Sequence, residues 1–533
     1  MFPNACVEEV LISEARQRAA GVAVFCAALG VIFGVPALGQ VRAAGVGADD
    51  AGRPVTVQVR QGAVRGVEQD GAVRFLGIPY AAPPVGAARW LPPTPAPAHG
   101  GTLEATDYGP VCPQPRSENA DEDCLTINVW TPAADDAARP VMVWLHGGGF
   151  RAGSGAIPGE LFAQEGIVIA SLNYRLGPLG FLAHPALDGP EANFALMDMV
   201  LALTWVRDNI AAFGGNPDQV TIFGISAGGM AVSLLLASEA GAGLFHGAIS
   251  QSGYGAWALP RTSSAPTPAP FGMGLGAAPN AETMGKELIA RVSADASTAE
   301  DLRALDADAL VAALQGFQLP IVDGVTLVEE PGIVALRGEA NQVPVIAGGN
   351  SFEGSVMPAS GVTPAQYEVW WGDDFPAAEA AYSTDFAVSY DRGIQRMFGD
   401  NRYLLAAQAL AEGMTKAVSP AWLYYIDFPA TPPVEDSPGA PHGFDGALLF
   451  RSQDSDNEHL RSLGSRLMTH WLAFARTGEP ALDASPAWTR WQSDVTDWLV
   501  LGPSGDEVQA SPLGPRMELL RSRYAARIGP AMR

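Results

Sequence analysis

Short runs of apolar, often β-branched residues recur along most of the chain, and longer stretches that are typical of helices separate them. We predict strands at Val141–His146, Ile167–Tyr174, Val220–Ser226, Ala248–Ser252, Val343–Gly348, Ala421–Phe428 and Trp498–Leu501. Helices are expected at residues 194–212 and 227–238, and residues 55–78 read as N-terminal hairpins with Gly-containing turns. Because strands and helices alternate, the pattern predicts an α/β fold with a large, mostly parallel central sheet.

Two regions interrupt this alternation. Residues 254–320 begin with Pro-, Ser- and Thr-rich sequence and continue into amphipathic segments near 281–293 and 299–315. Residues 355–418 form a second interruption that contains several aromatic residues. We interpret both as cap-like helical insertions above the sheet, rather than as a separate domain, because strand-like runs resume after each one. Residues 40–533 are therefore predicted to form one domain.

The most informative motif is Gly224-Ile225-Ser226-Ala227-Gly228, which ends a predicted strand and precedes a run of apolar helix formers. This strand, sharp turn and helix are the context of a nucleophile elbow. Glycines on both sides of the serine leave room where the helix packs tightly against its strand. Ser226 is therefore the candidate nucleophile, with the positive end of the following helix beneath its hydroxyl group.

The N-terminal segment has the layout of a secretory signal peptide. The apolar stretch Val22–Phe33 follows Arg16 and Arg18, and small residues precede a plausible cleavage site before Gln40. We therefore assign residues 1–39 to a signal peptide and expect a secreted or periplasmic protein. The alternative is an uncleaved membrane anchor, for which the apolar run is only marginally long enough.

Composition narrows the functional classes. The chain has 533 residues, of which 48% are apolar and 17% charged, and this balance favours a packed core over disorder. Its formal net charge of -25 argues against nucleic-acid binding, because phosphate groups would be repelled. We interpret the acidic balance as a solvated surface rather than as a device for binding cations.

Two cysteines remain once the signal peptide is removed. Cys112 and Cys124 lie close together in an exported chain, and we predict that they form a disulfide. A metal site would need further ligands, and no Cys/His cluster in the sequence provides them.

Beyond the elbow, the chain resembles the type-B carboxylesterase family of α/β-hydrolases over roughly residues 55–520. Five further segments carry the resemblance in the expected order: Phe75–Trp90, Glu122–Pro132, His146-Gly147-Gly148-Gly149-Phe150, Asn173–Gly177 and Phe213–Pro217. The resemblance implies an α/β-hydrolase fold. It also implies serine-dependent hydrolysis of a small-molecule carboxylic ester, with no metal or organic cofactor.

The family pattern also implies the groups that stabilise the oxyanion. The backbone N–H groups of Gly148, Gly149 and Ala227 are the expected donors. Glycines after an apolar strand agree with this role, because they allow backbone N–H groups to approach a developing oxyanion. Ser252 and Asp445 are candidate supporting residues, with turn capping as the alternative for each.

The other two members of the triad should follow Ser226 in the order acid, then histidine. Glu353 lies in Gly349-Asn350-Ser351-Phe352-Glu353-Gly354, just after a predicted strand, where open α/β sheets place their active sites, and the family has its acid in a similar segment. By chain order alone Asp323 and Asp373 are rivals, but neither follows such a strand. His442, in a Gly-x-x-His segment like that of the family, is the expected base.

Two departures from the family pattern concern the substrate. Ile225 stands before the nucleophile where the family usually has Glu, and the loop between the two cysteines is much shorter than the cholinesterase loop with the choline-binding Trp. A neutral or aromatic ester is therefore expected rather than a choline ester. Two alternatives remain: a hydrolase specialised for a large natural ester or a polyester, and a non-catalytic neuroligin-like binding module. All three triad residues are present, which argues against the second.

Overall fold

The computed structural model describes residues 52–265, 280–429, 438–480, 486–492 and 495–532. The predicted signal peptide, residues 1–39, lies outside the described residues, as does part of the first predicted insertion. The account below concerns the unit that begins at Arg53.

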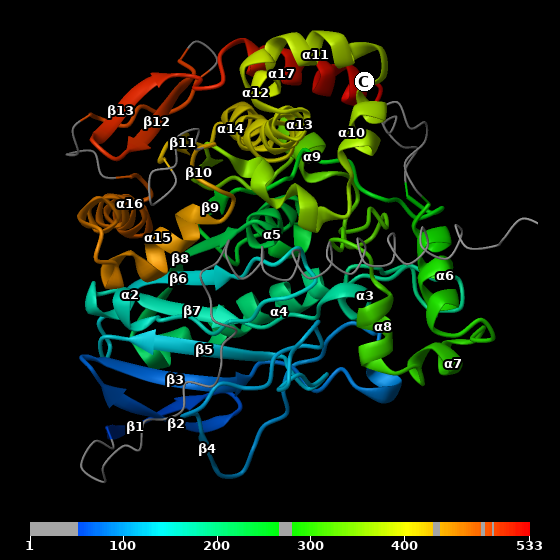
Figure 1. Cartoon of the computed structure of the whole chain (residues 1–533). Coiled ribbons are helices and arrows are strands. Elements are labelled where there is room, and N and C mark those ends of the chain that lie inside the picture. Colours follow the sequence, from blue (N-terminus) through cyan, green and yellow to red (C-terminus); the bar gives the residue numbers. More distant parts are fainter. Residues whose placement is uncertain (1–51, 266–279, 430–437, 481–485, 493–494, 533) are drawn as a thin grey trace, which may run out of the picture. The chain divides into compact units, whose positions relative to one another are not determined.

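Thirteen strands of the described chain form a single sheet in the order β1-β2-β3-β5-β7-β6-β8-β9-β10-β11-β12-β13, with β4 paired to β2 (Figure 1). The strands are β1 (Arg53–Val59), β2 (Gly62–Gln69), β3 (Ala72–Pro79), β4 (Thr102–Glu104), β5 (Thr126–Thr131), β6 (Arg139–Leu145), β7 (Val168–Leu172), β8 (Gly215–Ile225), β9 (Gly247–Gln251), β10 (Val345–Asn350), β11 (Ala421–Ile426), β12 (Asp497–Gly502) and β13 (Gly505–Ala510). From β7 to β12 all neighbours are parallel. Antiparallel pairs flank them on both sides, so the sheet is mostly parallel with N-terminal hairpins, as predicted.

Helices connect the strands and cover the sheet. They are α2 (Glu160–Gln164), α3 (Gly177–Gly180), α4 (Phe194–Asn209), α5 (Ala227–Ala237), α6 (Ala281–Val292), α7 (Ala299–Arg303), α8 (Ala307–Ala313), α9 (Pro331–Leu336), α10 (Pro364–Trp371), α11 (Phe375–Ala381), α12 (Ser383–Val388), α13 (Tyr390–Gly399), α14 (Leu405–Lys416), α15 (Phe444–Arg451), α16 (Glu458–Thr477) and α17 (Pro515–Ile528). A π-helical turn at Asp400–Leu404 joins α13 to α14.

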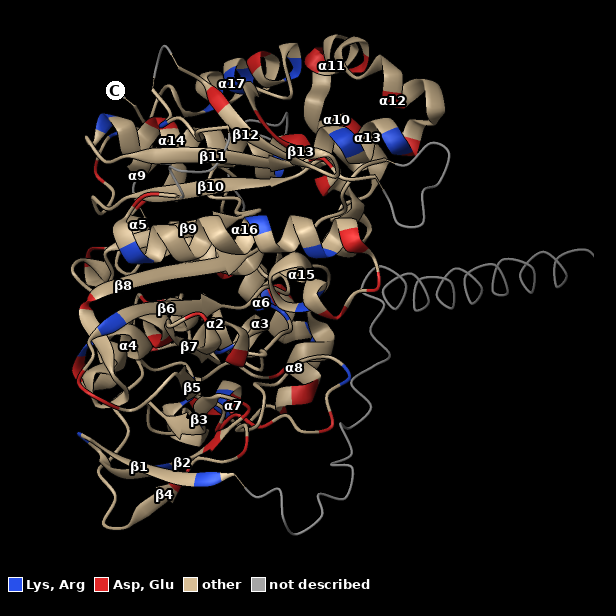
Figure 2. Ribbon diagram, turned by 90° about the vertical axis from the view of Figure 1, so that its left-hand side faces the viewer, with Lys and Arg blue, Asp and Glu red and all other residues tan. Residues whose placement is uncertain are grey.

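Helices cover both faces of the sheet, and the side chains of each strand point alternately to the two faces. In β6, Val143 and Leu145 join a core that includes residues of α4, α5 and α14. Met142 and Trp144 of the same strand join a second core with residues of α2, α15 and α16. Figure 2 looks onto this second face, where α16 runs across the sheet. The apolar runs of the sequence are therefore strands that are covered on both sides.

Some elements differ from the sequence-based expectation. All seven predicted runs contain strands, but β4, β5 and β13 were not predicted as strands. Residues 299–315 form two short helices instead of one, because α7 ends at Arg303 and the Asp306 side chain accepts a hydrogen bond from the N–H of Ala309 to begin α8.

Two further features bear on the predictions. Cys112 and Cys124 form a disulfide with Cα atoms 5.0 Å apart. None of the described helices combines the length and the hydropathy needed to cross a bilayer.

Candidate active site

The turn at Ser226 presents its hydroxyl group at the carboxyl end of β8. Ser226 has φ 57° and ψ -116°, an unfavourable conformation for a residue with a Cβ atom. The backbone holds it there, since its N–H donates to the carbonyl oxygen of Gln251 at 2.8 Å. A Cβ atom at Gly228 would lie 2.0 Å from the carbonyl oxygen of Leu145, so only glycine lets α5 approach β6 this closely.

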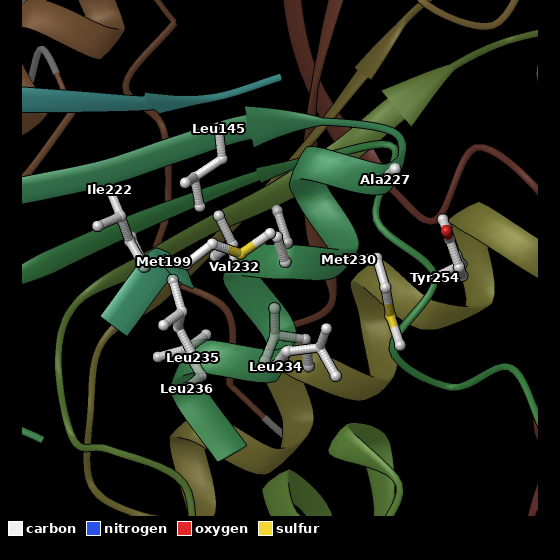
Figure 3. Packing of buried hydrophobic residues seen from close by; sticks show 14 of the residues in the cluster. Leu145, Met199, Ile222, Ala227, Met230, Val232, Leu234, Leu235, Leu236 and Tyr254 are labelled. Atoms are coloured by element: carbon white, nitrogen blue, oxygen red, sulfur yellow. The ribbon is translucent and has the colours of Figure 1, made fainter. Parts of the chain in front are cut away.

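The helix after the turn is anchored along its length. Figure 3 shows Val232 and Leu235 of α5 pointing toward Ile222 of β8 and Met199 of α4, and all four side chains are fully buried. This packing fixes the direction in which α5 leaves the turn. The strained conformation of Ser226 is thus maintained by the surrounding core.

Three residues that are far apart in sequence meet at this end of the sheet. The imidazole Nε2 of His442 lies 2.8 Å from the Oγ atom of Ser226, and its Nδ1 is hydrogen-bonded to Oε2 of Glu353. Ser226 follows β8, Glu353 follows β10, and His442 lies in the segment after β11. The nucleophile, base and acid expected from the sequence therefore form one hydrogen-bonded series.

The Glu353 carboxylate is buried and fully hydrogen-bonded. Its Oε1 atom accepts from the Ser252 hydroxyl at 2.7 Å, from the backbone N–H of Asn350 at 2.6 Å and from the Asn350 side chain at 3.0 Å. Only 1% of Glu353 is exposed. These donors fix the carboxylate and leave Oε2 for His442, so Ser252 lies where a supporting residue was expected.

A second buried carboxylate lies behind the first. Asp445 accepts hydrogen bonds from the Asn350 side chain at 3.1 Å and from the Tyr424 hydroxyl at 2.5 Å. Burial, and next the negative charge of Glu353, raise the pKa of Asp445 above its ordinary value. Asn350 therefore bridges two carboxylates, and Asp445 reaches the triad through it.

The glycine-rich loop after β6 lies beside the nucleophile. Gly148 and Gly149 have φ values of 112° and 64°, which suit glycine. The carbonyl oxygen of Gly148 accepts from the N–H groups of Arg151 and Ala152, so the Gly149 N–H, on the opposite side of the same peptide, points away from that turn. Ala227 is the first residue of α5, where a backbone N–H has no partner within the helix.

His146, at the start of this loop, is buried. Its ring stacks on Tyr174 at 4.1 Å, and the Tyr174 hydroxyl donates to the His146 carbonyl oxygen at 2.6 Å. Burial lowers the pKa of His146 to about 4, so its imidazole is neutral at pH 7.

The two rival acids lie elsewhere. Asp323 accepts hydrogen bonds from the N–H groups of Ala192, Val325, Thr326 and Leu327 and so orders a turn. Asp373 is exposed in a short 3₁₀ turn at Gly372–Asp374. The carboxylate bonded to His442 is that of Glu353.

Sequence reasoning missed several neighbours of the triad. Asn350 lies in the segment that identifies Glu353, but the sequence alone indicates no role for it. The ring of Tyr403 lies 4.5 Å from that of His442, and Tyr424 supports Asp445. Neither tyrosine lies in a recognisable motif. Among the described residues, no group of three or more His, Cys, Asp or Glu side chains is arranged to hold a metal ion.

Comparison with known proteins agrees with this architecture. The profile of the Carboxylesterase family matches residues 53–370 and 373–519. The chain is 33% identical to a fumonisin B1 esterase of Sphingopyxis macrogoltabida, over 81% of this chain and 84% of that protein. It is also 33% identical to a para-nitrobenzyl esterase of Bacillus subtilis, over 84% and 94% of the two chains.

Solved structures extend the comparison to the fold. A carboxylesterase of Geobacillus stearothermophilus superposes with a TM-score of 0.73 at 28% identity, covering 87% of this chain and 99% of that one. A PNB esterase structure gives the same TM-score and coverage at 30% identity. The chain belongs to the carboxylesterase family of the α/β-hydrolase superfamily and is a serine-dependent carboxylic ester hydrolase.

Proposed function

We propose that this esterase works through a triad of Ser226, His442 and Glu353. His442 accepts the Ser226 proton as the hydroxyl oxygen attacks the ester carbonyl, and Glu353 orients the imidazole and stabilises its protonated form. His442 then donates the proton to the leaving alcohol. Water, activated by the same histidine, hydrolyses the acyl-enzyme.

The oxyanion of each tetrahedral intermediate is proposed to bind to the backbone N–H groups of Gly148, Gly149 and Ala227. Fixed donors of this kind act where charge develops in the transition state, without reorganisation during the reaction. Ser252 and Asp445 are proposed as supports that hold the acid in place. The hydrogen-bonded series from Ser226 through His442 to Glu353 is the observation that carries the proposal.

The assignment is tested at the nucleophile. Ser226→Ala should lower kcat on the order of 10⁴-fold or more and leave the fold intact, because it removes only the attacking oxygen. A fluorophosphonate should label the wild-type chain once, at Ser226, as identified by peptide mass spectrometry. Label on another serine, or full activity in the variant, would show that a different residue is the nucleophile.

The substrate is proposed to be a neutral or aromatic ester. Ile225 places an aliphatic side chain next to the nucleophile, which gives no electrostatic attraction to a cationic leaving group. A narrower candidate is an esterase dedicated to one large natural ester by the same mechanism. The similarity to a protein that is named for a single substrate, fumonisin B1, supports this narrower candidate.

We further propose that the protein is exported and that residues 40–533 form its mature domain, with segments 254–320 and 355–418 covering the active site. The apolar N-terminal stretch and the disulfide support this view. Intact-mass analysis without reductant should show a mature N-terminus near Gln40 and no free thiol. An unprocessed N-terminus would contradict export by this route.

A further inference from the structure

One buried arginine differs from all the others that the structure describes. Five arginines are less than 9% exposed, and four of them form an ion pair with a carboxylate: Arg89 with Glu122, Arg175 with Asp198, Arg261 with Glu329 and Arg527 with Glu330. Arg402 is the fifth. It is only 3% exposed, yet none of the ion pairs between described residues includes it.

Aromatic rings surround the Arg402 guanidinium. Its central carbon lies 4.3 Å from the ring centre of Tyr254, 4.6 Å from that of Trp257 and 5.7 Å from that of Tyr403. The ring centres of Phe317 and Phe398 lie 6.0 Å and 5.7 Å from the same carbon. Ring faces attract a cation, but they give its N–H groups no oxygen acceptor in the guanidinium plane.

The hydrogen-bonding groups of this cluster lack partners of normal geometry. Arg402 Nε and Nη2 and the hydroxyl groups of Tyr254 and Tyr403 are buried, and none of them forms a hydrogen bond of normal length and angle with a described residue. The guanidinium is nevertheless close enough to both hydroxyl groups to interact with them. Burial raises the pKa of Tyr254 to about 12 and that of Tyr403 further, although the nearby guanidinium opposes both shifts. Both phenols therefore remain hydrogen-bond donors at neutral pH.

The edge of the Arg402 guanidinium formed by Nε and Nη2 is the edge with which Arg175 binds a carboxylate. Arg175 donates from Nε at 2.9 Å and from Nη2 at 2.7 Å to the two oxygens of Asp198. These two nitrogens present parallel N–H bonds that match the two oxygens of a carboxylate. In Arg402 the same pair of donors forms no such hydrogen bond with a described residue.

The cluster borders the catalytic centre on two sides. Tyr403 packs against His442 with ring centres 4.5 Å apart. Phe317 packs against Gly149, where an added Cβ atom would lie 2.3 Å from its ring. Figure 3 places Tyr254 at the end of α5 that carries Ala227. Tyr403 and Phe317 therefore contact both the catalytic centre and the Arg402 guanidinium.

We propose that Arg402, together with the hydroxyl groups of Tyr254 and Tyr403, binds a carboxylate that the ester substrate carries away from its scissile bond. The favoured substrates are then esters with a free carboxylate on their acyl or alcohol part. The inference rests on the proposed triad and changes the proposed substrate: the group beside Ile225 is still uncharged, but the molecule carries a carboxylate elsewhere. The aromatic rings bind the carbon chain that joins the two groups.

Matched substrates test the proposal. One series consists of p-nitrophenyl esters of increasing acyl length that end in a carboxylate, each paired with the carboxamide of the same shape. A second series carries the same two end groups on the alcohol part. In one of the series the wild-type enzyme should favour the carboxylate by at least roughly tenfold in kcat/KM, because polar groups built to bind a substrate oxygen discriminate strongly. The assays are run at an ionic strength of about 0.5 M, which screens the long-range repulsion of anions by this acidic protein.

Two variants locate the preference. Arg402→Met keeps an unbranched side chain of similar length without the charge, and the ratio of kcat/KM for the two end groups should fall to about one. Arg523→Met is the matched control, because Arg523 lies 4.4 Å from the ring centre of Trp371 and pairs with Asp374. Its ratio should equal that of wild type. Equal ratios in wild type and Arg402→Met, or no carboxylate preference in either wild-type series, would overturn the proposal.

If Arg402→Met does not fold, inhibition of the wild-type enzyme tests the proposal. Glutarate should then inhibit hydrolysis of a neutral ester competitively, and the uncharged diamide glutaramide should not. Equal inhibition by the two, or none by glutarate, would overturn the proposal. Failure of the proposed function looks different, because neither the carboxylate nor the carboxamide esters would then be hydrolysed through Ser226.

Discussion

The Glu353 carboxylate is held by neutral donors from Ser252 and Asn350, so its negative charge is available to the imidazole of His442. Glu353→Gln keeps the size of the side chain and removes that charge. We expect kcat to fall on the order of 10³- to 10⁴-fold, because protonated His442 is no longer stabilised and its tautomer is no longer fixed. Steady-state kinetics on folded protein, verified by circular dichroism, measure the loss.

Asp323→Asn is the comparison for this substitution. Asp323 orders a buried turn, so its replacement should lower the melting temperature but leave kcat per folded molecule within a few-fold of wild type. A larger loss of kcat in Asp323→Asn than in Glu353→Gln would mean that the acid has been misassigned.

Asp445 should leave a signature in the pH dependence of stability. Its pKa in the folded protein is raised, first by burial and then by Glu353, so the folded state holds this proton to higher pH than the unfolded chain does. The stability that the proton provides is complete below the unfolded value of about 4 and is lost as pH rises through the raised folded value. Between these two values, the free energy of unfolding should fall with rising pH more steeply in wild type than in Asp445→Asn.

Urea denaturation of both proteins at a series of pH values from about 4 to 7 gives this difference directly, since titrations common to both cancel. Parallel curves for wild type and Asp445→Asn would contradict a raised pKa at this position.

At the residue scale, what the sequence could predict depended on how local the signal was. Ser226, Glu353 and His442 each lie in a short segment whose glycines and neighbouring strand mark its place in the fold. Asn350 and Tyr424 acquire their roles only when β10 and β11 bring them beside Asp445. Arg402 is distinctive because of what surrounds it, and no pattern along the chain reveals that a buried arginine lacks a carboxylate.

At the scale of elements, helix α13 forms hydrogen bonds with both loops that carry the proposed acid, Glu353, and the proposed base, His442. Arg396 of α13 donates hydrogen bonds to the carbonyl oxygens of Ser351 and, at 2.6 Å, Pro438. The loops also contact each other directly, since the Phe352 N–H donates to the Ala440 carbonyl oxygen at 2.7 Å. Arg396 therefore helps to set the distance between Glu353 and His442.

Arg396→Met should lower kcat by about 10- to 100-fold and change KM little, because small displacements of catalytic groups slow the chemical step more than they weaken binding. Arg392→Met is the matched control. Arg392 lies on the same helix, 5.1 Å from the ring centre of Phe352, and both arginines form an ion pair with Asp385. Equal losses of kcat in the two variants would show that the helix as a whole, and not the bonds of Arg396 to the two carbonyl oxygens, matters for catalysis.

The elements that could be predicted most readily were those with a continuous apolar run. The apolar runs of the central strands are buried on both faces, which makes them conspicuous in the sequence. Thr126–Thr131 mixes polar and apolar residues and is distinctive only as part of a family motif, so only its pairing with β3 and β7 identifies it as strand β5. The break between α7 and α8 depends on one capping aspartate inside a continuous helical pattern.

At the scale of the whole molecule, long-range charge and local contacts at the active site have opposite effects on a cationic substrate. The net charge of -25 attracts cations from a distance, whereas Ile225 offers a cation nothing beside the nucleophile. Acetylthiocholine should therefore be a poorer substrate than an uncharged thioester of similar size at high ionic strength, where long-range attraction is screened. Ile225→Glu should shift the ratio of kcat/KM toward the cation several-fold, since a partly buried carboxylate adds roughly 1 kcal/mol of attraction.

The measurement is kcat/KM for both thioesters at low and high salt. A tenfold or greater preference of the wild-type enzyme for acetylthiocholine in high salt would contradict the prediction and would require a cation site elsewhere in the active site.

The separation of 216 residues between Ser226 and His442 has a consequence for the biosynthesis of the enzyme. At about 5–20 residues per second, the ribosome adds the histidine at least roughly ten seconds after the serine. During that interval the growing chain carries a nucleophile without its base, because β10 and β11 have not yet joined the sheet. A ribosome that stalls in this stretch releases no fragment able to cleave esters. Hydrolytic activity thus begins only after most of the polypeptide has been made.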